Sequence, residues 1–107
     1  MICLFQNIRN VYHMSLDKIR ADITKVDREI IRLIALRQNY AGAIAKIKIN
    51  TGIPIHDEQR TSEVLESAFN QAVERKIDPV AVQKIFDILI TMSEDRQRDC
   101  SGEGNLP

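Results

Sequence analysis

The sequence contains few aromatic residues, cysteines, glycines and prolines. Phenylalanine and tyrosine make up 5% of its 107 residues, tryptophan is absent, and there are two cysteines, four glycines and three prolines. Apolar residues account for 44% of the chain, which is enough for one domain with a core. Because large aromatic side chains are scarce, we expect only modest packing in a monomer.

Net charge is lacking as well, since fifteen basic and fifteen acidic residues cancel. No basic run occurs, which argues against a nucleic-acid-binding protein. Cys3 and Cys100 lie in the end segments, so we expect no disulfide framework and a reducing compartment. His13 and His56 lack the spacing of metal ligands, and no metal site is predicted. We expect His56 and Cys100 to face solvent.

The sequence also lacks a recognisable targeting or membrane-spanning segment. Residues 1–13 have no cationic start followed by a long apolar core, and no apolar run approaches membrane length. We therefore expect a soluble, cytoplasmic protein without a membrane partner. Residues 1–14 are expected to be an extension, disordered or packed as a short arm. Residues 15–98 then form a helical domain, and residues 99–107 a disordered tail.

A long helix is predicted from Leu16 to Asn50. Ser15 is a good N-cap, and Gly52 followed by Pro54 is a usual stop signal. Roughly 35 residues at ~1.5 Å each give about 52 Å, whereas a compact domain of ~100 residues has a radius of gyration near 13 Å. The helix should project beyond its own monomer. A second copy, packed antiparallel about a two-fold axis, would cover its apolar seam.

One seam position of this helix is occupied by a cation. Arg37 stands in the middle of the stripe, where a charge is costly unless an anion meets it. Lys48 lies eleven residues on, about 20° round the helix and on the same face. Arg20 precedes Arg37 by roughly 25 Å of helix, so one small ligand cannot contact both. The seam consists of Leu16, Ile19, Ile23, Val26, Ile30, Leu33, Arg37, Tyr40, Ile44 and Ile47.

Two further helices are predicted. Asp57 is a candidate N-cap for a helix that runs to about Glu74, and Asp78 followed by Pro79 starts the third. The fold class is therefore all-α, with a three-helix subunit and a long first helix. The expected buried faces are Val64, Leu65, Ala68, Phe69, Ala72 and Val73 in the second helix, and Val82, Ile85, Phe86, Leu89 and Ile90 in the third.

Several hydrogen-bonding side chains lie on or beside helix faces that should be apolar. Arginine binds carboxylates in bidentate fashion, and converging cations suit a small ligand with two carboxylates. No nucleophile is paired with a base, and neither a metal cluster nor a glycine-rich phosphate loop is visible. We therefore predict a pocket that binds and polarises a dianion without metal or cofactor. Its residues are Arg20, Arg37, Lys48, Arg60, Ser93 and Gln97.

A structural explanation stays open for most of these cations. Long basic side chains often extend along a helix to solvent or pair with acids one turn away. A non-catalytic helical dimer that binds a dicarboxylate is consistent with the same pattern. The candidate ion pairs are Arg20 with Asp17 or Asp27, and Arg60 with Asp57 or Glu63.

The order and spacing of these segments resemble a known family. The pattern LxxIRxxIxxxDxxIxxLIAxRxxxAxxIxxIK spans residues 16–48, GIPIxDxxR spans 52–60 and VLE spans 64–66. IDPxxVxxIFxxLI follows over residues 77–90, and then Ser93 and Gln97, four residues apart. Together they resemble the all-α chorismate mutases of the shikimate pathway. The resemblance covers about residues 15–97.

The resemblance implies an intertwined helical homodimer that converts chorismate to prephenate by a Claisen rearrangement, with no cofactor. Each active site of the family takes one arginine from the partner subunit, and Arg20 matches that residue. The remaining correspondences are Arg37 and Arg60 at the carboxylates, Lys48 and Gln97 at the ether oxygen, Ser93 at a carboxylate, and Asp57 near the substrate hydroxyl.

Thr61 departs from the family pattern. Chorismate mutases commonly have a glutamate there, which accepts the ring hydroxyl, whereas threonine is shorter and uncharged. Related isochorismate-pyruvate lyases share the cationic residues and have a non-acidic residue at this position. They are the alternative enzyme class, although Ser93 fits the mutase pattern better.

Overall fold

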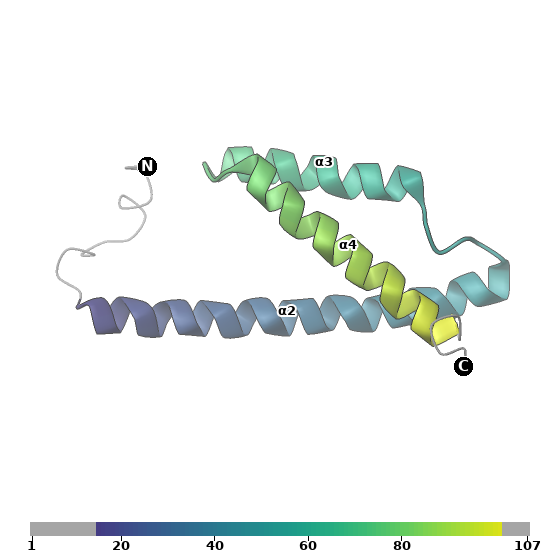
Figure 1. Cartoon of the computed structure of the whole chain (residues 1–107), viewed down its shortest axis with the longest axis horizontal. Coiled ribbons are helices and arrows are strands. Elements are labelled where there is room, and N and C mark those ends of the chain that lie inside the picture. The colour runs from purple at the N-terminus through teal and green to yellow at the C-terminus, as the bar shows by residue number, and fades with distance from the viewer. Residues whose placement is uncertain (1–14, 102–107) are drawn as a thin grey trace. The chain divides into compact units, whose positions relative to one another are not determined.

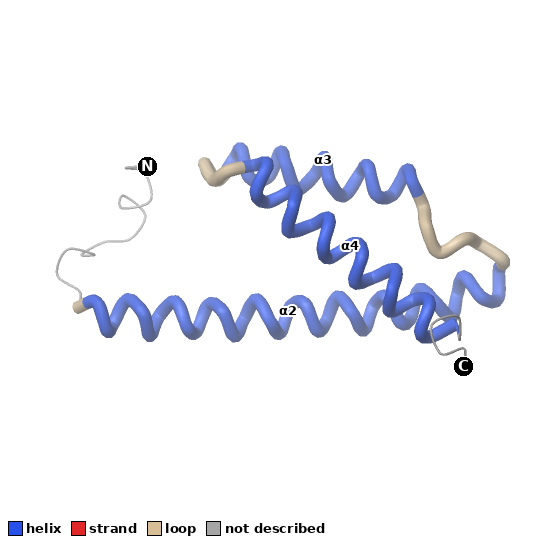
Figure 2. The backbone as a smooth tube through the Cα atoms, viewed as in Figure 1, coloured by secondary structure: helices blue, strands red, loops and turns tan. Residues whose placement is uncertain are grey.

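The computed structural model describes residues 15–101, which form three helices and, within that range, no strand (Figure 1, Figure 2). Helix α2 spans Leu16–Thr51, α3 spans Glu58–Glu74 and α4 spans Pro79–Ser101. The prediction of an all-α chain with a long first helix is confirmed. The predictions for residues 1–14 and 102–107 lie outside the described residues.

Two parts of the chain are described separately, one up to Leu33 and the other from Ile34 onward. The first part contains the N-terminal half of α2. The second contains the rest of α2, the connecting loop, α3 and α4. In residues 15–101, no helix combines the length and the apolar character that crossing a membrane requires.

Side-chain caps fix where the helices begin. Ser15 Oγ accepts from the backbone N–H of Lys18 at 3.1 Å, and Asp57 Oδ1 accepts from the N–H of Arg60 at 3.0 Å. Asp78 Oδ1 accepts from two N–H groups of the first turn of α4, at 3.0 and 3.3 Å. Each cap satisfies donors that a helix start leaves free, so the three predicted starts agree with the structure.

The helix ends differ in part from the prediction. Helix α2 ends at Thr51 and is followed by Gly52, whose φ of +71° is readily adopted only by glycine. Helix α4 continues to Ser101, so the segment 99–101 is helical and does not belong to a disordered tail. The last turn of α4 lies against α2. This is seen at Gly42, where an added Cβ would meet Cys100 Sγ at 3.6 Å. Cys100 is therefore half-buried, and the expectation that it faces solvent was wrong.

Small residues form the buried face of α2. Ala41, Gly42 and Ala45 are buried, whereas the seam residues Tyr40 and Ile47 are 64% and 59% exposed. The seam residues therefore lie outside the core of one chain, and the expectation that a second copy covers them stays a prediction. The short side chains let α4 approach α2 closely, and the larger apolar residues remain on the surface.

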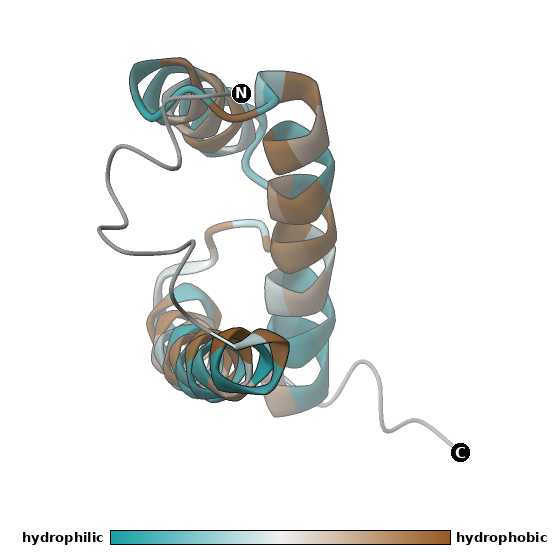
Figure 3. Ribbon diagram, turned by 90° about the vertical axis from the view of Figure 1, so that its left-hand side faces the viewer, coloured by the Kyte–Doolittle hydropathy of each residue, from teal (hydrophilic) through white to brown (hydrophobic). Residues whose placement is uncertain are grey.

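Helix α3 packs on α4 through a similar small-residue face. Ala68 and Ala72 of α3 are buried. Apolar residues recur along most of α4, which is seen from a second direction in Figure 3. Val73 and Ile85, both predicted to be core residues, are more than half exposed, so that part of the prediction was wrong.

Candidate active site

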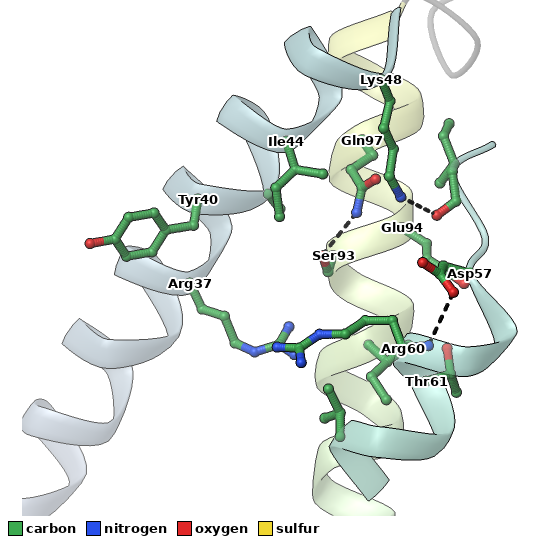
Figure 4. A pocket seen from close by; sticks show the side chains of 14 residues that line it. Arg37, Tyr40, Ile44, Lys48, Asp57, Arg60, Thr61, Ser93, Glu94 and Gln97 are labelled. Carbon is green, nitrogen blue, oxygen red and sulfur yellow. Dashed lines mark hydrogen bonds between the residues drawn. The ribbon is translucent and has the colours of Figure 1, made fainter. Parts of the chain in front are cut away.

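A pocket of about 410 Å³ opens among the C-terminal half of α2, the loop after it, α3 and α4 (Figure 4). It lies wholly within the part of the chain that begins at Ile34. All of the predicted site residues except Arg20 line it. They are Arg37, Lys48, Asp57, Arg60, Thr61, Ser93 and Gln97.

Two arginines supply positive charge on one side of the pocket. Arg37, which is half-buried, donates from Nη1 to the carbonyl oxygen of Leu89 at 2.9 Å. Its pKa is lowered first by burial and then by the charge of Arg60, whose guanidinium points toward that of Arg37 in Figure 4. Two cations that face each other repel unless an anion lies between them. The pair is therefore suited to bind a carboxylate.

Arg60 has a second contact, which agrees with one of the alternatives left open by the sequence. Its Nη1 lies 3.5 Å from Glu63 Oε2, and both side chains are mostly exposed. An exposed pair at this spacing is weak. A ligand carboxylate can therefore draw Arg60 away at little cost. The side chain of Asp57 contacts the backbone N–H of Arg60, where it caps α3, rather than the guanidinium.

Gln97 is 5% exposed and is the one buried polar residue of the described chain. Its Nε2 donates to Ser93 Oγ at 3.1 Å, while its Oε1 is buried without a hydrogen-bond partner. An unsatisfied buried polar atom costs roughly 1–3 kcal/mol, so the amide is poised to gain from a polar ligand. The sequence placed Gln97 at the edge of an apolar face, whereas the structure places it inside.

Lys48 connects α2 to the loop that follows it. Its Nζ donates to the carbonyl oxygen of Ile55 at 2.6 Å, and the side chain is half-buried. An ammonium group has three N–H donors, so one contact leaves others for a ligand. Because Lys48 and Gln97 line the same pocket, a charged and a neutral donor are available together.

The sequence reasoning missed an acid in this pocket. Glu94 lines it, and its Oε1 lies 2.7 Å from Nδ1 of His56. His56 Nε2 lies 2.8 Å from Glu58 Oε2. Hydrogen bonds to Glu94 first, and to Glu58 second, raise the pKa of His56. The pocket therefore contains a carboxylate beside the cations that the sequence predicted.

A sequence signal for Glu94 was present but weak. It stands three residues before Gln97, which places the two side chains on the same side of a helix. Its partner His56 lies in a loop 38 residues earlier, and no periodicity connects the two. His56 is exposed, as expected, but it has two acidic partners. Within residues 15–101, no group of three or more His, Cys, Asp or Glu is placed to hold a metal ion.

Arg20 is the predicted site residue that the pocket does not include. It lies on the part of α2 before Leu33, and its side chain is exposed. Within the described residues, its guanidinium forms no ion pair with Asp17 or Asp27. The structural explanation left open for Arg20 therefore gains no support.

The fold and the pocket together define a class, that of an all-helical protein with a pocket lined by several cations. A family profile described as chorismate mutase type II matches residues 19–98. The chain belongs to this family. As a member of this family, the protein is an isomerase, a chorismate mutase. The resemblance predicted from the sequence is confirmed.

Curated relatives agree with the family assignment. A protein named chorismate mutase, from Methanocaldococcus jannaschii, is 35% identical over 83 residues, which are 78% of this chain and 84% of that relative. A bifunctional chorismate mutase/prephenate dehydratase from Buchnera aphidicola is 28% identical over 74 residues, 69% of this chain and 19% of the relative. A protein of the same name from Aquifex aeolicus is 37% identical over 51 residues, 48% and 14% of the two chains. No solved structure matches.

Proposed function

We propose that the pocket among α2, α3 and α4 is the active site in which chorismate is rearranged to prephenate. The observation that carries this proposal is the facing pair of Arg37 and Arg60 beside the two donors Lys48 and Gln97. Chorismate carries two carboxylates and an ether oxygen. Such a pocket offers cations to the carboxylates and hydrogen-bond donors to the oxygen.

The proposed reaction requires neither a proton transfer nor a cofactor. In a Claisen rearrangement the ether carbon–oxygen bond breaks while a carbon–carbon bond forms within the same molecule, and no proton is transferred. An enzyme accelerates such a step by holding the reacting carbons together and by stabilising charge on the departing oxygen. A rigid pocket with donors on one side can do both.

The arginines have the first of these tasks. Arg37 is held by Leu89 on α4, and Arg60 stands in the first turn of α3, so a substrate that bridges them is oriented by two helices. We assign both to the substrate carboxylates, together with the hydroxyl of Ser93. Asp57 and Thr61 lie at the start of α3 and line the same pocket, where we expect them near the substrate ring.

Lys48 and Gln97 have the second task. As the ether bond breaks, negative charge grows on the oxygen, and a pre-positioned donor binds this oxygen more strongly in the transition state than in the substrate. Lys48 is positioned by Ile55 and Gln97 by Ser93. The amide nitrogen of Gln97 has two N–H groups, so one can donate to the ether oxygen while the other donates to Ser93 Oγ, whose own hydrogen stays available for a carboxylate.

The proposed enzyme is a homodimer in which Arg20 serves the partner's site. Support comes from large apolar side chains of α2, such as Ile23, Val26 and Ile30, which are at least half exposed and spaced three and four residues apart. A second copy would cover them. Arg20 belongs to the same helix, is exposed and lacks an acidic partner within residues 15–101. The cytoplasmic location expected from the sequence stays a prediction.

An absorbance assay tests the function. Purified protein incubated with chorismate should consume it, and the product should be prephenate. Because Thr61 is uncharged, isochorismate should be tested in parallel, with pyruvate as the product of a lyase. Pyruvate release from isochorismate, with no prephenate from chorismate, would contradict the proposal. Binding of chorismate without turnover would indicate the non-catalytic alternative.

A mixing experiment tests the shared site. Arg20→Ala and Arg37→Ala homodimers should each be nearly inactive, because every site lacks one arginine. In a heterodimer of the two variants, one site carries both substitutions and the other is intact. After subunit exchange at equal amounts, about a quarter of the wild-type activity should return. No recovery, despite exchange verified by mass spectrometry, would exclude a donated Arg20.

A further inference from the structure

Glu94 gives the cationic pocket a carboxylate of its own. Its side chain is 15% exposed, it lines the pocket from α4, and Figure 4 shows it among the labelled residues there. An anion close to a site for a dianion weakens binding unless it receives a hydrogen bond from the ligand. Glu94 is therefore compatible with binding of a dianion if the substrate donates a hydrogen bond to it.

His56 holds this carboxylate while leaving part of it available. Nδ1 of His56 is 2.7 Å from Oε1 and 3.4 Å from Oε2 of Glu94, and its other nitrogen contacts Glu58. An ionised carboxylate accepts at about four lone-pair positions, so one imidazole does not saturate it. The loop of His56 is itself tied to α2 through Lys48 and the carbonyl of Ile55. Glu94 is thus a positioned acceptor.

The neighbouring candidates are less suited to accept from a ligand. Asp57 also lines the pocket, but its Oδ1 already accepts from a backbone N–H as the cap of α3. Thr61 has only a neutral hydroxyl, and Ser93 Oγ accepts from Gln97. A hydrogen bond to an ionised acceptor is roughly twice as strong as one between neutral groups. Glu94 is therefore the carboxylate of this pocket that is not engaged as a helix cap.

We propose that Glu94 is a specificity-determining residue whose carboxylate accepts a hydrogen bond from the ring hydroxyl of chorismate. His56 acts as a positioning residue that orients this carboxylate. The inference rests on the proposed function, because the hydroxyl belongs to that substrate. In family members that have a glutamate at the position of Thr61, the acceptor for the ring hydroxyl belongs to α3. Here the proposed acceptor, Glu94, belongs to α4.

A pair of isosteric substitutions tests the proposal. Glu94→Gln should raise KM for chorismate about tenfold, the effect of replacing a charged acceptor by a neutral one, with little change in kcat. Glu58→Gln is the matched control, because Glu58 also contacts His56 but does not line the pocket. It should leave KM unchanged. If Glu94→Gln does not fold by circular dichroism, Glu94→Asp replaces it and should also raise KM.

Two further measurements separate recognition of the hydroxyl from a structural role. An inhibitor with the ring hydroxyl and its analogue without it should differ in affinity for the wild type and much less for Glu94→Gln. Adding Thr61→Glu to Glu94→Gln should restore KM, because the new carboxylate can accept from the substrate hydroxyl. If Glu94 only supported the fold, a carboxylate at position 61 would not restore KM. Unchanged or lowered KM in Glu94→Gln, or equal discrimination by both proteins, would overturn the proposal. A wild type inactive on chorismate would instead overturn the proposed function, and this inference with it.

Discussion

Arg37 on α2 donates from Nη1 to the carbonyl oxygen of Leu89 on α4, at 2.9 Å. This contact joins residues 52 positions apart and orients a half-buried guanidinium toward the pocket. A carbonyl dipole compensates the charge only in part, and the pKa of Arg37 is lowered by burial and by Arg60. The cation is thus available to a carboxylate.

Replacing Arg37 should reduce activity strongly. Arg37→Lys keeps the charge but loses the planar fork that binds a carboxylate through two N–H groups. We expect kcat/KM to fall about a hundredfold or more, since charged contacts of this kind contribute roughly 2–4 kcal/mol. Arg32→Lys on the same helix is the control. Arg32 pairs with Glu29 away from the pocket, and its replacement should leave kcat/KM within about twofold of wild type.

The Gln97→Glu variant should convert a flat pH profile into a steep one. The wild-type amide is neutral, so its ability to donate does not change across neutral pH. A buried carboxyl donates only when protonated, and burial raises its pKa. We expect activity at low pH that falls about tenfold for each unit of pH above that raised pKa. Steady-state rates from pH 5 to 9 give the profile, and a flat profile in the variant would show that Gln97 does not act as a donor.

The contacts of His56 should make stability depend on pH. Its pKa is raised by Glu94 and Glu58, so the folded chain binds this proton more tightly than the unfolded chain. The stabilisation is fully present below the ordinary histidine pKa, near 6.5, and is lost as pH rises through the raised value.

His56→Gln should therefore lower the melting temperature relative to wild type near pH 6, with a difference that shrinks as pH increases. Differential scanning fluorimetry across pH 5.5 to 9 measures this. Lys18→Gln, which removes an exposed contact with Asp22 that involves no histidine, provides the comparison. A difference between wild type and His56→Gln that grows with pH would contradict the sign of the shift.

Charge on the exposed stripe of α2 should dissociate the proposed dimer. Ile30 is 50% exposed in a single chain, and Ile30→Asp would bury a carboxylate in an apolar interface. We expect dimer affinity to fall at least about a hundredfold, with loss of activity at low protein concentration because each site then lacks Arg20. Arg28→Asp places the same residue on the opposite face of the helix. Arg28→Asp should remain a dimer in sedimentation experiments. If both variants were monomers, or both were dimers, the predicted interface would be contradicted.

Local chemistry determined most of the secondary structure. Ser15, Asp57 and Asp78 cap helices in the structure as their side chains predict, because a cap depends only on backbone N–H groups a few residues away. The exception is the end of α4, where the helix continues to Ser101 and its last turn lies beside Gly42 of α2. Gly42 is far away in the sequence, so no local signal reports this neighbour.

For the site as well, some features follow from the sequence and others depend on tertiary packing. The sequence by itself determined that cations interrupt apolar faces, because helical periodicity makes a misplaced charge such as Arg37 visible. Only the tertiary structure decided that Glu94 enters the pocket, since its partner His56 comes from a loop brought to α4 by folding. Likewise, packing selected Ala41 and Ala45 over Ile44 and Ile47 for the buried face of α2. Periodicity identifies an apolar side of a helix, but only the approach of a second helix decides which part of that side it covers.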